Sequence, residues 1–179
     1  MKKFLFVVIA LCLIVFPVFA ETEEVQVITW DEAEEAFTEN GYHGLIYSFD
    51  KLGFEMMIPD GLEMAELTEE MFYDRGIMSV FIDESGTRQV VVELSNLYCE
   101  TLDEVADMVS ENVGDAQFAY AQINGLNALL FTNPGEDSVT CVLNAGDGYF
   151  VQVTVSPSED EYMHAMTNYI FASIRPIEE

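Results

Sequence analysis

Four apolar segments follow one another in the last third of the chain, and residues that form turns separate each from the next. The segments span 118–123, 128–132, 138–143 and 149–155. Between them lie Asn124-Gly125, Asn133-Pro134-Gly135 and the run from Asn144 to Gly148. Asn, Gly and Pro adopt turn conformations at low cost, and short strands joined by such turns pair with their immediate neighbours. The pattern therefore predicts an antiparallel meander as the centre of the fold.

Two earlier hairpins extend this prediction. Segments 45–49 and 54–58 flank a four-residue loop, and segments 78–82 and 89–94 flank Asp83-Glu84-Ser85-Gly86-Thr87. Both loops have the composition of hairpin connections. Pro59-Asp60-Gly61 is expected to end the strand at 54–58.

Four positions in the chain have residues typical of a helix start. Thr29 with Glu32 and Thr101 with Glu104 have the spacing of capping boxes, and Thr68 could cap a short helix within 62–76. Ser156-Pro157-Ser158-Glu159 supplies an N-cap, a first-turn proline and a glutamate for the last helix. Asn40-Gly41 would stop the first helix. We therefore expect an α+β fold in which helices flank an antiparallel β-sheet.

The first twenty residues predict an export signal. Lys2 and Lys3 precede an apolar run from Phe4 to Phe16, and Ala20 closes a site suited to cleavage. A retained anchor is disfavoured because the run is short for a membrane span, and a lipoprotein is disfavoured because Leu11 precedes Cys12. We expect a secreted or extracytoplasmic protein without a membrane span after cleavage. The predicted organisation is a signal at 1–20, an acidic segment with a short helix at 21–43 and one α+β domain at 44–179.

Charge excludes one class of partner. Loss of the signal leaves four basic residues against 33 acidic ones, a formal net charge of 4 − 33 = −29. Nucleic acids are bound largely through Lys and Arg, so this composition argues against them and also against anionic lipid. It suits a cationic partner or calcium, and it equally suits solubility alone.

Two cysteines, Cys99 and Cys141, remain in the predicted mature chain. An even count in an exported protein permits a disulfide between them. The alternative is two buried thiols, because a free cysteine packs as a small apolar side chain.

No catalytic motif emerges from the sequence. His43 and His164 lack metal-ligand spacing, and nucleotide loops and serine-nucleophile elbows are missing. We expect no cofactor and no enzymatic activity. The enzyme alternative would require His43 or His164 to meet Cys99, Cys141 or a carboxylate in a cleft.

Two kinds of binding site stay open. Acidic loops at Asp83-Glu84-Ser85-Gly86, Glu136-Asp137-Ser138 and Asp147-Gly148 offer oxygen ligands for calcium, although none has EF-hand spacing. Methionines and aromatic residues could line a groove for a peptide or a small apolar ligand, and the alternative is that they pack the core.

Three short motifs resemble the PsbP/DcrB-like domains. They are Gly53-Phe54-Glu55-Met56-Met57-Ile58-Pro59-Asp60-Gly61-Leu62, Ile123-Asn124-Gly125-Leu126-Asn127-Ala128 and Phe171-Ala172-Ser173-Ile174-Arg175, with Leu62 where that family often has tryptophan. The resemblance covers about residues 44 to 176. It implies an α/β/α sandwich and a role as a binding or assembly factor without shared catalytic residues. Together with the export signal it predicts a non-enzymatic binding or accessory domain whose partner is a protein, a peptide or a small apolar ligand.

Overall fold

The computed structural model describes residues 25–177, so the predicted export signal lies outside the described residues. Four helices are described: α2 (Trp30–Glu39), α3 (Glu69–Tyr73), α4 (Leu102–Asn112) and α5 (Glu161–Ala172). The strands of the first half are β1 (Gln26–Ile28), β2 (Gly44–Phe49), β3 (Phe54–Pro59), β4 (Glu63–Met64), β5 (Ile77–Ile82) and β6 (Gln89–Asn96). Those of the second half are β7 (Phe118–Ile123), β8 (Leu126–Asn133), β9 (Ser138–Gly146), β10 (Tyr149–Ser156) and β11 (Arg175–Pro176).

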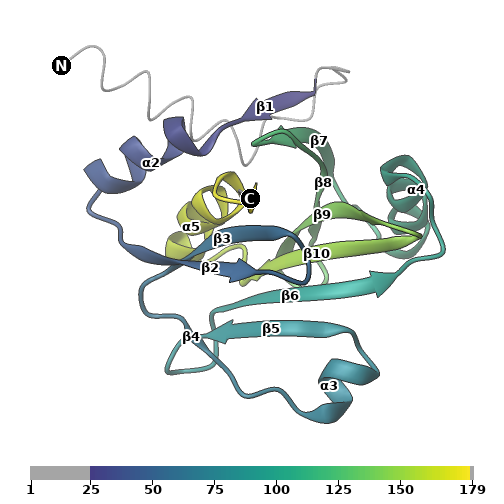
Figure 1. Ribbon diagram of the computed structural model, residues 1–179, viewed down its shortest axis with the longest axis horizontal. Helices are drawn as coiled ribbons and strands as arrows, with labels where there is room; N and C mark the ends of the chain where they lie inside the picture. Colours follow the sequence, from purple (N-terminus) through teal and green to yellow (C-terminus); the bar gives the residue numbers. More distant parts are fainter. Residues whose placement is uncertain (1–24, 178–179) are drawn as a thin grey trace.

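The larger of two sheets has the strand order β1-β7-β8-β9-β10-β6-β5-β4 (Figure 1). Strands β7 to β10 pair antiparallel with their chain neighbours, which confirms the predicted meander. Strand β10 then pairs with β6, and β5 and β6 form the second predicted hairpin. Only β1 departs from the antiparallel pattern among the described strands, because it pairs parallel with β7. The α+β fold with a mainly antiparallel sheet is confirmed.

A second sheet, with the order β11-β3-β2, was not expected from the sequence. Its central strand β3 is apolar on both faces, and Met56, Met57 and Ile58 are each at most 2% exposed. A strand of this kind needs a cover on each side. Tyr47 of β2 contacts Phe81 of the large sheet with ring centroids 4.8 Å apart. Helix α5 contacts β3. The hairpin therefore forms a layer of its own.

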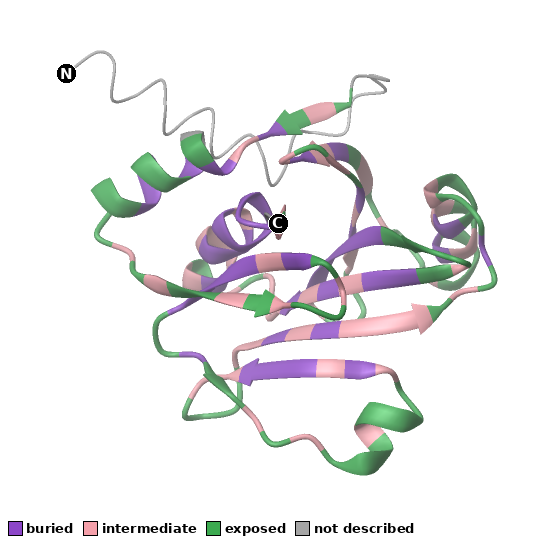
Figure 2. Ribbon diagram, viewed as in Figure 1, coloured by how far each residue is buried: buried purple, intermediate pink, exposed green. Residues whose placement is uncertain are grey.

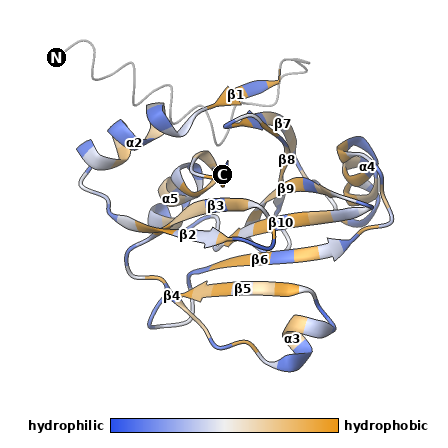
Figure 3. Ribbon diagram, in the orientation of Figure 1, coloured by the Kyte–Doolittle hydropathy of each residue, from blue (hydrophilic) through white to orange (hydrophobic). Residues whose placement is uncertain are grey.

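Helices cover both faces of the large sheet. Helix α4 packs against β8 and β9 on one face, where Val105 and Val109 join a cluster with Leu129 and Val142. The other face packs against the small sheet and α5, and α2 lies on α5. Figure 2 shows α5 mostly buried, whereas α2 and α3 turn much of their surface to solvent. Figure 3 shows the matching hydropathy, with blue residues on α2 and a mostly orange β5.

The start predicted for the last helix is wrong. Helix α5 begins at Glu161 and is capped by Asp160, whose carboxylate accepts from the Met163 N–H at 2.9 Å, not by Ser156. The carboxylate of Asp137 accepts hydrogen bonds from the Ser158 hydroxyl and the Glu159 N–H, which holds these residues outside the helix.

Thr29 precedes α2 but makes no side-chain capping bond. The N–H of Trp30 instead donates to Oδ1 of Asn124 at 2.8 Å. The capping positions at Thr68 and Thr101 are confirmed, since each hydroxyl accepts the N–H three residues ahead.

The Asn124 side chain joins three parts of the chain. Besides accepting from Trp30, it donates through Nδ2 to the carbonyl oxygens of Ala172 at 2.7 Å and Ile174 at 2.8 Å. The residue lies in the β7–β8 turn with φ 46°, a left-handed conformation that Asn and Gly tolerate. One turn residue thus fixes the start of α2 and the end of α5 on the sheet.

We predict that Asn124→Gly lowers the free energy of unfolding by about 2–3 kcal/mol, at about 1 kcal/mol for each lost hydrogen bond. Glycine keeps the left-handed backbone accessible, so the loss reports the side-chain contacts. Asn124→Ala should lose more because it adds backbone strain. Urea denaturation measures both variants, with the exposed Asn127→Ala as the matched control. Wild-type stability in Asn124→Gly would contradict this role.

Candidate functional site

The two cysteines lie in separate hydrophobic clusters on opposite sides of the large sheet. Cys141 of β9 faces the small sheet and α5 and has no exposed surface, whereas Cys99 lies with the α4 cluster and is 8% exposed. Both thiols are free. The structure thus favours the alternative of two buried thiols over the disulfide that the sequence permitted.

Both thiols are buried and have a raised pKa, which lowers their nucleophilic reactivity. Burial raises the pKa of Cys141, and burial followed by the nearby Glu104 carboxylate raises the pKa of Cys99. His43 is exposed just before β2, and His164 lies on α5, across the large sheet from Cys99. A cysteine nucleophile acts as a thiolate and needs access to substrate. Burial therefore limits the access of a substrate to either thiol in this structure.

In two of the three acidic loops proposed for calcium, an aspartate carboxylate accepts local hydrogen bonds. The Asp83 carboxylate accepts from the Ser85 hydroxyl and from the N–H groups of Thr87 and Arg88. Asp137 binds residues 158 and 159 as described above. Across residues 25–177, no three His, Cys, Asp or Glu side chains are grouped so that they could hold a metal ion.

Methionines mostly serve the core. Met56, Met57, Met163 and Met166 are at most 2% exposed, which matches the packing alternative. Met64 is different, because 55% of it is exposed on the short strand β4. It lies in a hollow that sequence reasoning missed.

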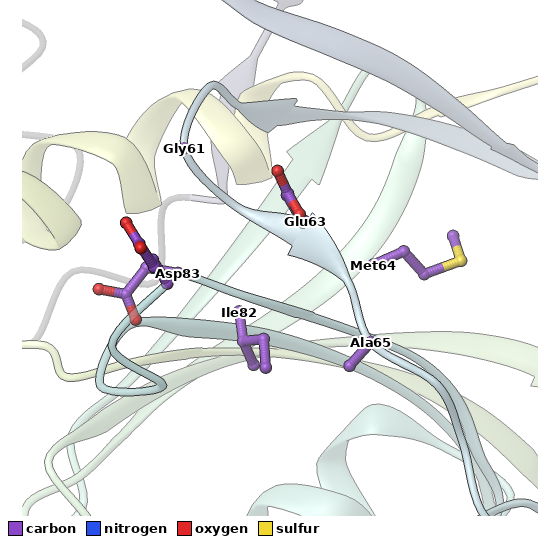
Figure 4. A pocket seen from close by; sticks show the side chains of 7 residues that line it. Gly61, Glu63, Met64, Ala65, Ile82 and Asp83 are labelled. Atoms are coloured by element: carbon purple, nitrogen blue, oxygen red, sulfur yellow. The ribbon is translucent and has the colours of Figure 1, made fainter.

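This hollow has a volume of about 590 Å³ and opens at the edge of the large sheet. Its lining comes from two segments, residues 61–65 and residues 82–84: Gly61, Glu63, Met64, Ala65, Ile82, Asp83 and Glu84. Figure 4 shows Glu63 next to the Gly61 turn, Met64 and Ala65 farther along the same segment, and Asp83 and Ile82 on the facing segment. The hollow is therefore acidic at one end and apolar at the other.

Strand pairing and two turns build the hollow. Glu63 pairs with Ile82 and Met64 with Phe81 in the antiparallel β4–β5 ladder. The chain reaches β4 through a turn in which the Leu62 N–H donates to the Pro59 carbonyl at 3.3 Å. On the other side, the hydrogen bonds of Asp83 fix the β5–β6 turn. The hollow is thus an outcome of tertiary pairing between two segments, without a motif of its own.

The electrostatics of the hollow are negative. Its lining includes three carboxylates and no basic side chain. Hydrogen bonds from Ser85 and from the Arg88 and Thr87 backbone lower the pKa of Asp83 to about 2. Asp83 therefore stays ionised, and Glu63 and Glu84 are exposed beside it.

Arg88, the basic residue of this turn, is engaged elsewhere. Its guanidinium donates to the Asp160 carboxylate at 2.9 Å and lies 4.9 Å from the centre of the Tyr162 ring. This pairing raises the pKa of Arg88 and lowers that of Asp160. Arg88 is therefore paired at the start of α5 and does not neutralise the carboxylates of the hollow.

The comparisons with known proteins find similarity among solved structures. No protein-family model matches the chain, and no curated protein matches it. The solution structure of cyanobacterial PsbP (CyanoP) from Synechocystis sp. PCC 6803 is similar over 74% of this chain and 92% of that one. The TM-score is 0.48 and the sequence identity 16%.

No helix within residues 25–177 combines the length and apolar character needed to cross a membrane.

We predict that neither Cys99 nor Cys141 reacts rapidly in the native protein. A disulfide exchange reagent should label Cys141 only after unfolding, since the residue has no exposed surface. Cys99 should react slowly because only 8% of it is exposed. Mass spectrometry of unreduced protein alkylated in denaturant should find both thiols modified, and a product lacking both would establish the disulfide instead.

We predict a pH dependence from Asp83. Its pKa falls from 3.8 to about 2 on folding. A lowered pKa stabilises the fold at pH values above the unfolded pKa, and that contribution is lost as the pH falls through the folded pKa. The difference in melting temperature between the wild type and Asp83→Asn should therefore shrink from about pH 4 to about pH 2. A carboxyl titration of Asp83 by NMR near 3.8 would show that the turn does not hold the carboxylate.

Proposed function

We propose that this protein is a non-enzymatic, extracytoplasmic binding or accessory domain that takes a cationic ligand with an apolar body. The hollow between residues 61–65 and 82–84 is the binding site. The observation that carries the proposal is its lining, which combines three carboxylates with Met64, Ala65 and Ile82 and has no basic side chain.

The chemistry of the ligand follows from that lining. An ammonium or guanidinium group would lie against the carboxylates of Glu63 and Glu84, since Asp83 is already bonded within its turn. An alkyl chain would cover Met64 and Ile82, and a flexible methionine adapts to different shapes. A lysine or arginine side chain next to an aliphatic one has both features.

The rest of the molecule agrees with such a ligand. The formal net charge of the whole chain is −27, which draws cations toward the surface. Two of the four basic residues beyond the predicted signal are paired inside the fold, Arg88 with Asp160 and Arg175 with Glu55. The export signal proposed from Lys2, Lys3 and the apolar run would deliver the domain to compartments where basic proteins and peptides are accessible.

A small probe tests the proposal without involving larger surfaces. Acetyl-leucyl-lysine amide should bind in a calorimetric titration at low salt, and acetyl-leucyl-glutamine amide should bind more weakly. Glu63→Gln and Glu84→Gln should each lower the affinity by about two- to fivefold, the range of an exposed ion pair. Binding should weaken as salt is added, because exposed charges are screened.

The matched control is Glu111→Gln, which removes the same charge from the exposed surface of α4. It should leave the affinity unchanged within about 1.5-fold, since it lies outside the hollow. Equal losses in all three variants would indicate general charge attraction. Equal binding of the lysine and glutamine probes would overturn the proposed site.

A further inference from the structure

The four outer strands of the two sheets differ in how they are protected against pairing with a further strand. Strands β1, β4 and β11 have three, two and two residues. Strand β11 also contains Pro176, which has no N–H to offer. Short edge strands and proline are devices that prevent a further strand from adding. Three of these edges are therefore blocked by length or sequence.

Strand β2 lacks every one of these devices. It has six residues, Gly-Leu-Ile-Tyr-Ser-Phe, with no charge and no proline. It pairs only with β3 among the described strands and forms the outer edge of the small sheet. In Figure 2 it is coloured exposed and intermediate beside the buried β3. An uncharged edge of this length is a template for strand pairing.

The hydrogen-bond register identifies the backbone groups that β2 presents outward. The Asp60 N–H donates to the His43 carbonyl at 2.9 Å, and the β2–β3 ladder continues from there in register. Hydrogen-bonded pairs alternate in an antiparallel ladder, so Leu45, Tyr47 and Phe49 bond to β3. The N–H and C=O groups of Gly44, Ile46 and Ser48 consequently point away from β3.

The far side of β3 supports this assignment. The Met57 N–H, which the same alternation turns away from β2, donates to the Ser173 hydroxyl at 2.8 Å. The Ile177 N–H likewise donates to the Gly53 carbonyl on the β11 side. Within residues 25–177, β3 is paired on both sides, whereas the outer side of β2 has no partner strand.

Apolar side chains accompany these backbone groups. Leu45 is 63% exposed and Ile46 44% exposed, on opposite faces of the strand. A strand added beside β2 would cover both through cross-strand contacts. Asp50 and Asp60 are exposed, one at each end of β2. Lys51 is a basic residue directly after Asp50.

The charge of the protein and the small area of the β2 edge favour a basic peptide segment over a second copy of this chain. Two copies of this chain would each bring a formal charge of −27 to the contact. A pair of six-residue strands also covers much less than the roughly 1,200–2,000 Å² of a stable protein interface. Strand addition by a peptide segment needs no such area, since main-chain hydrogen bonds supply affinity. Lysines or arginines at the ends of that segment would complement Asp50, Asp60 and the acidic surface.

We propose that β2 is a docking edge that accepts an extended segment of another protein, with β-forming residues in its centre and basic residues at its ends. The segment adds as a fourth strand of the small sheet. This edge uses residues outside the acidic hollow, so the inference stands even if the hollow binds no ligand.

The probe is a synthetic peptide of alternating valine and threonine with paired lysines at both ends. Its binding to the protein is followed by fluorescence anisotropy and by amide hydrogen exchange. Binding should slow exchange of the Gly44, Ile46 and Ser48 amides by about tenfold or more, because they gain hydrogen bonds. Ser48→Pro removes one outward N–H without touching the β3 ladder and should weaken binding about tenfold.

Ser48→Ala keeps the N–H and is the matched control, with affinity expected at the wild-type level. Thermal unfolding of both variants verifies that the fold is retained, and Ile46→Lys, which places a cation on the edge, gives a second blocking variant. Absence of binding or unchanged affinity in Ser48→Pro and Ile46→Lys would overturn the proposal. So would equal binding of a peptide with glutamates in place of the lysines, or protection that depends on protein concentration alone, which would identify a second copy as the occupant.

Discussion

The arrangement of the layers depends on the side chain of Asn124. Through three hydrogen bonds it connects the β7–β8 turn to the first residue of α2 and to the carbonyls of Ala172 and Ile174. Buried or partly buried backbone groups at helix ends are costly when they lack partners. An amide side chain has both acceptor and donor groups, so one residue serves both helices. The position of α5 in turn supports β3, whose Met57 N–H bonds to Ser173 just after the helix.

Strand β3 connects the packing around α5 to both proposed binding surfaces. It pairs with β2 on one side and leads through Pro59 and Asp60 to the hollow at Gly61. The bond from the Asp60 N–H to the His43 carbonyl ties the start of β2 to the same turn. The start of β2 and the segment that lines the hollow therefore follow from the same turn. This arrangement suits a domain that recognises an extended, cationic partner.

Most secondary structure was predictable because the local signals agreed with the tertiary fold. Asn124-Gly125 marks a turn in any context, and Thr101 caps α4 as its sequence indicates. Ser156 failed as a helix start because Asp137, distant in sequence, takes up the hydrogen bonds of residues 158 and 159. The separate small sheet escaped prediction because a hairpin pattern identifies a strand and its partner without assigning the pair to a sheet.

The candidate site was less accessible to sequence reasoning. Asp83 and Glu84 were identified as an acidic loop, but their relation to Glu63 and Met64 arises only when β4 pairs with β5. The histidines and cysteines were candidates because their side chains can act in catalysis. The fold places Cys99 and Cys141 in two interior clusters. The open edge of β2 was equally hidden, since an edge is defined by the strands that are missing beside it. Both proposed sites therefore depend on long-range strand pairing, which local sequence patterns do not reveal.

A backbone amide NMR titration with acetyl-leucyl-lysine amide tests the central claim most directly, because it locates a cationic ligand residue by residue. We predict that the largest chemical-shift changes fall on residues 61–65 and 82–84, which line the hollow. Shift changes spread evenly over exposed acidic residues, including those of α4, would contradict it.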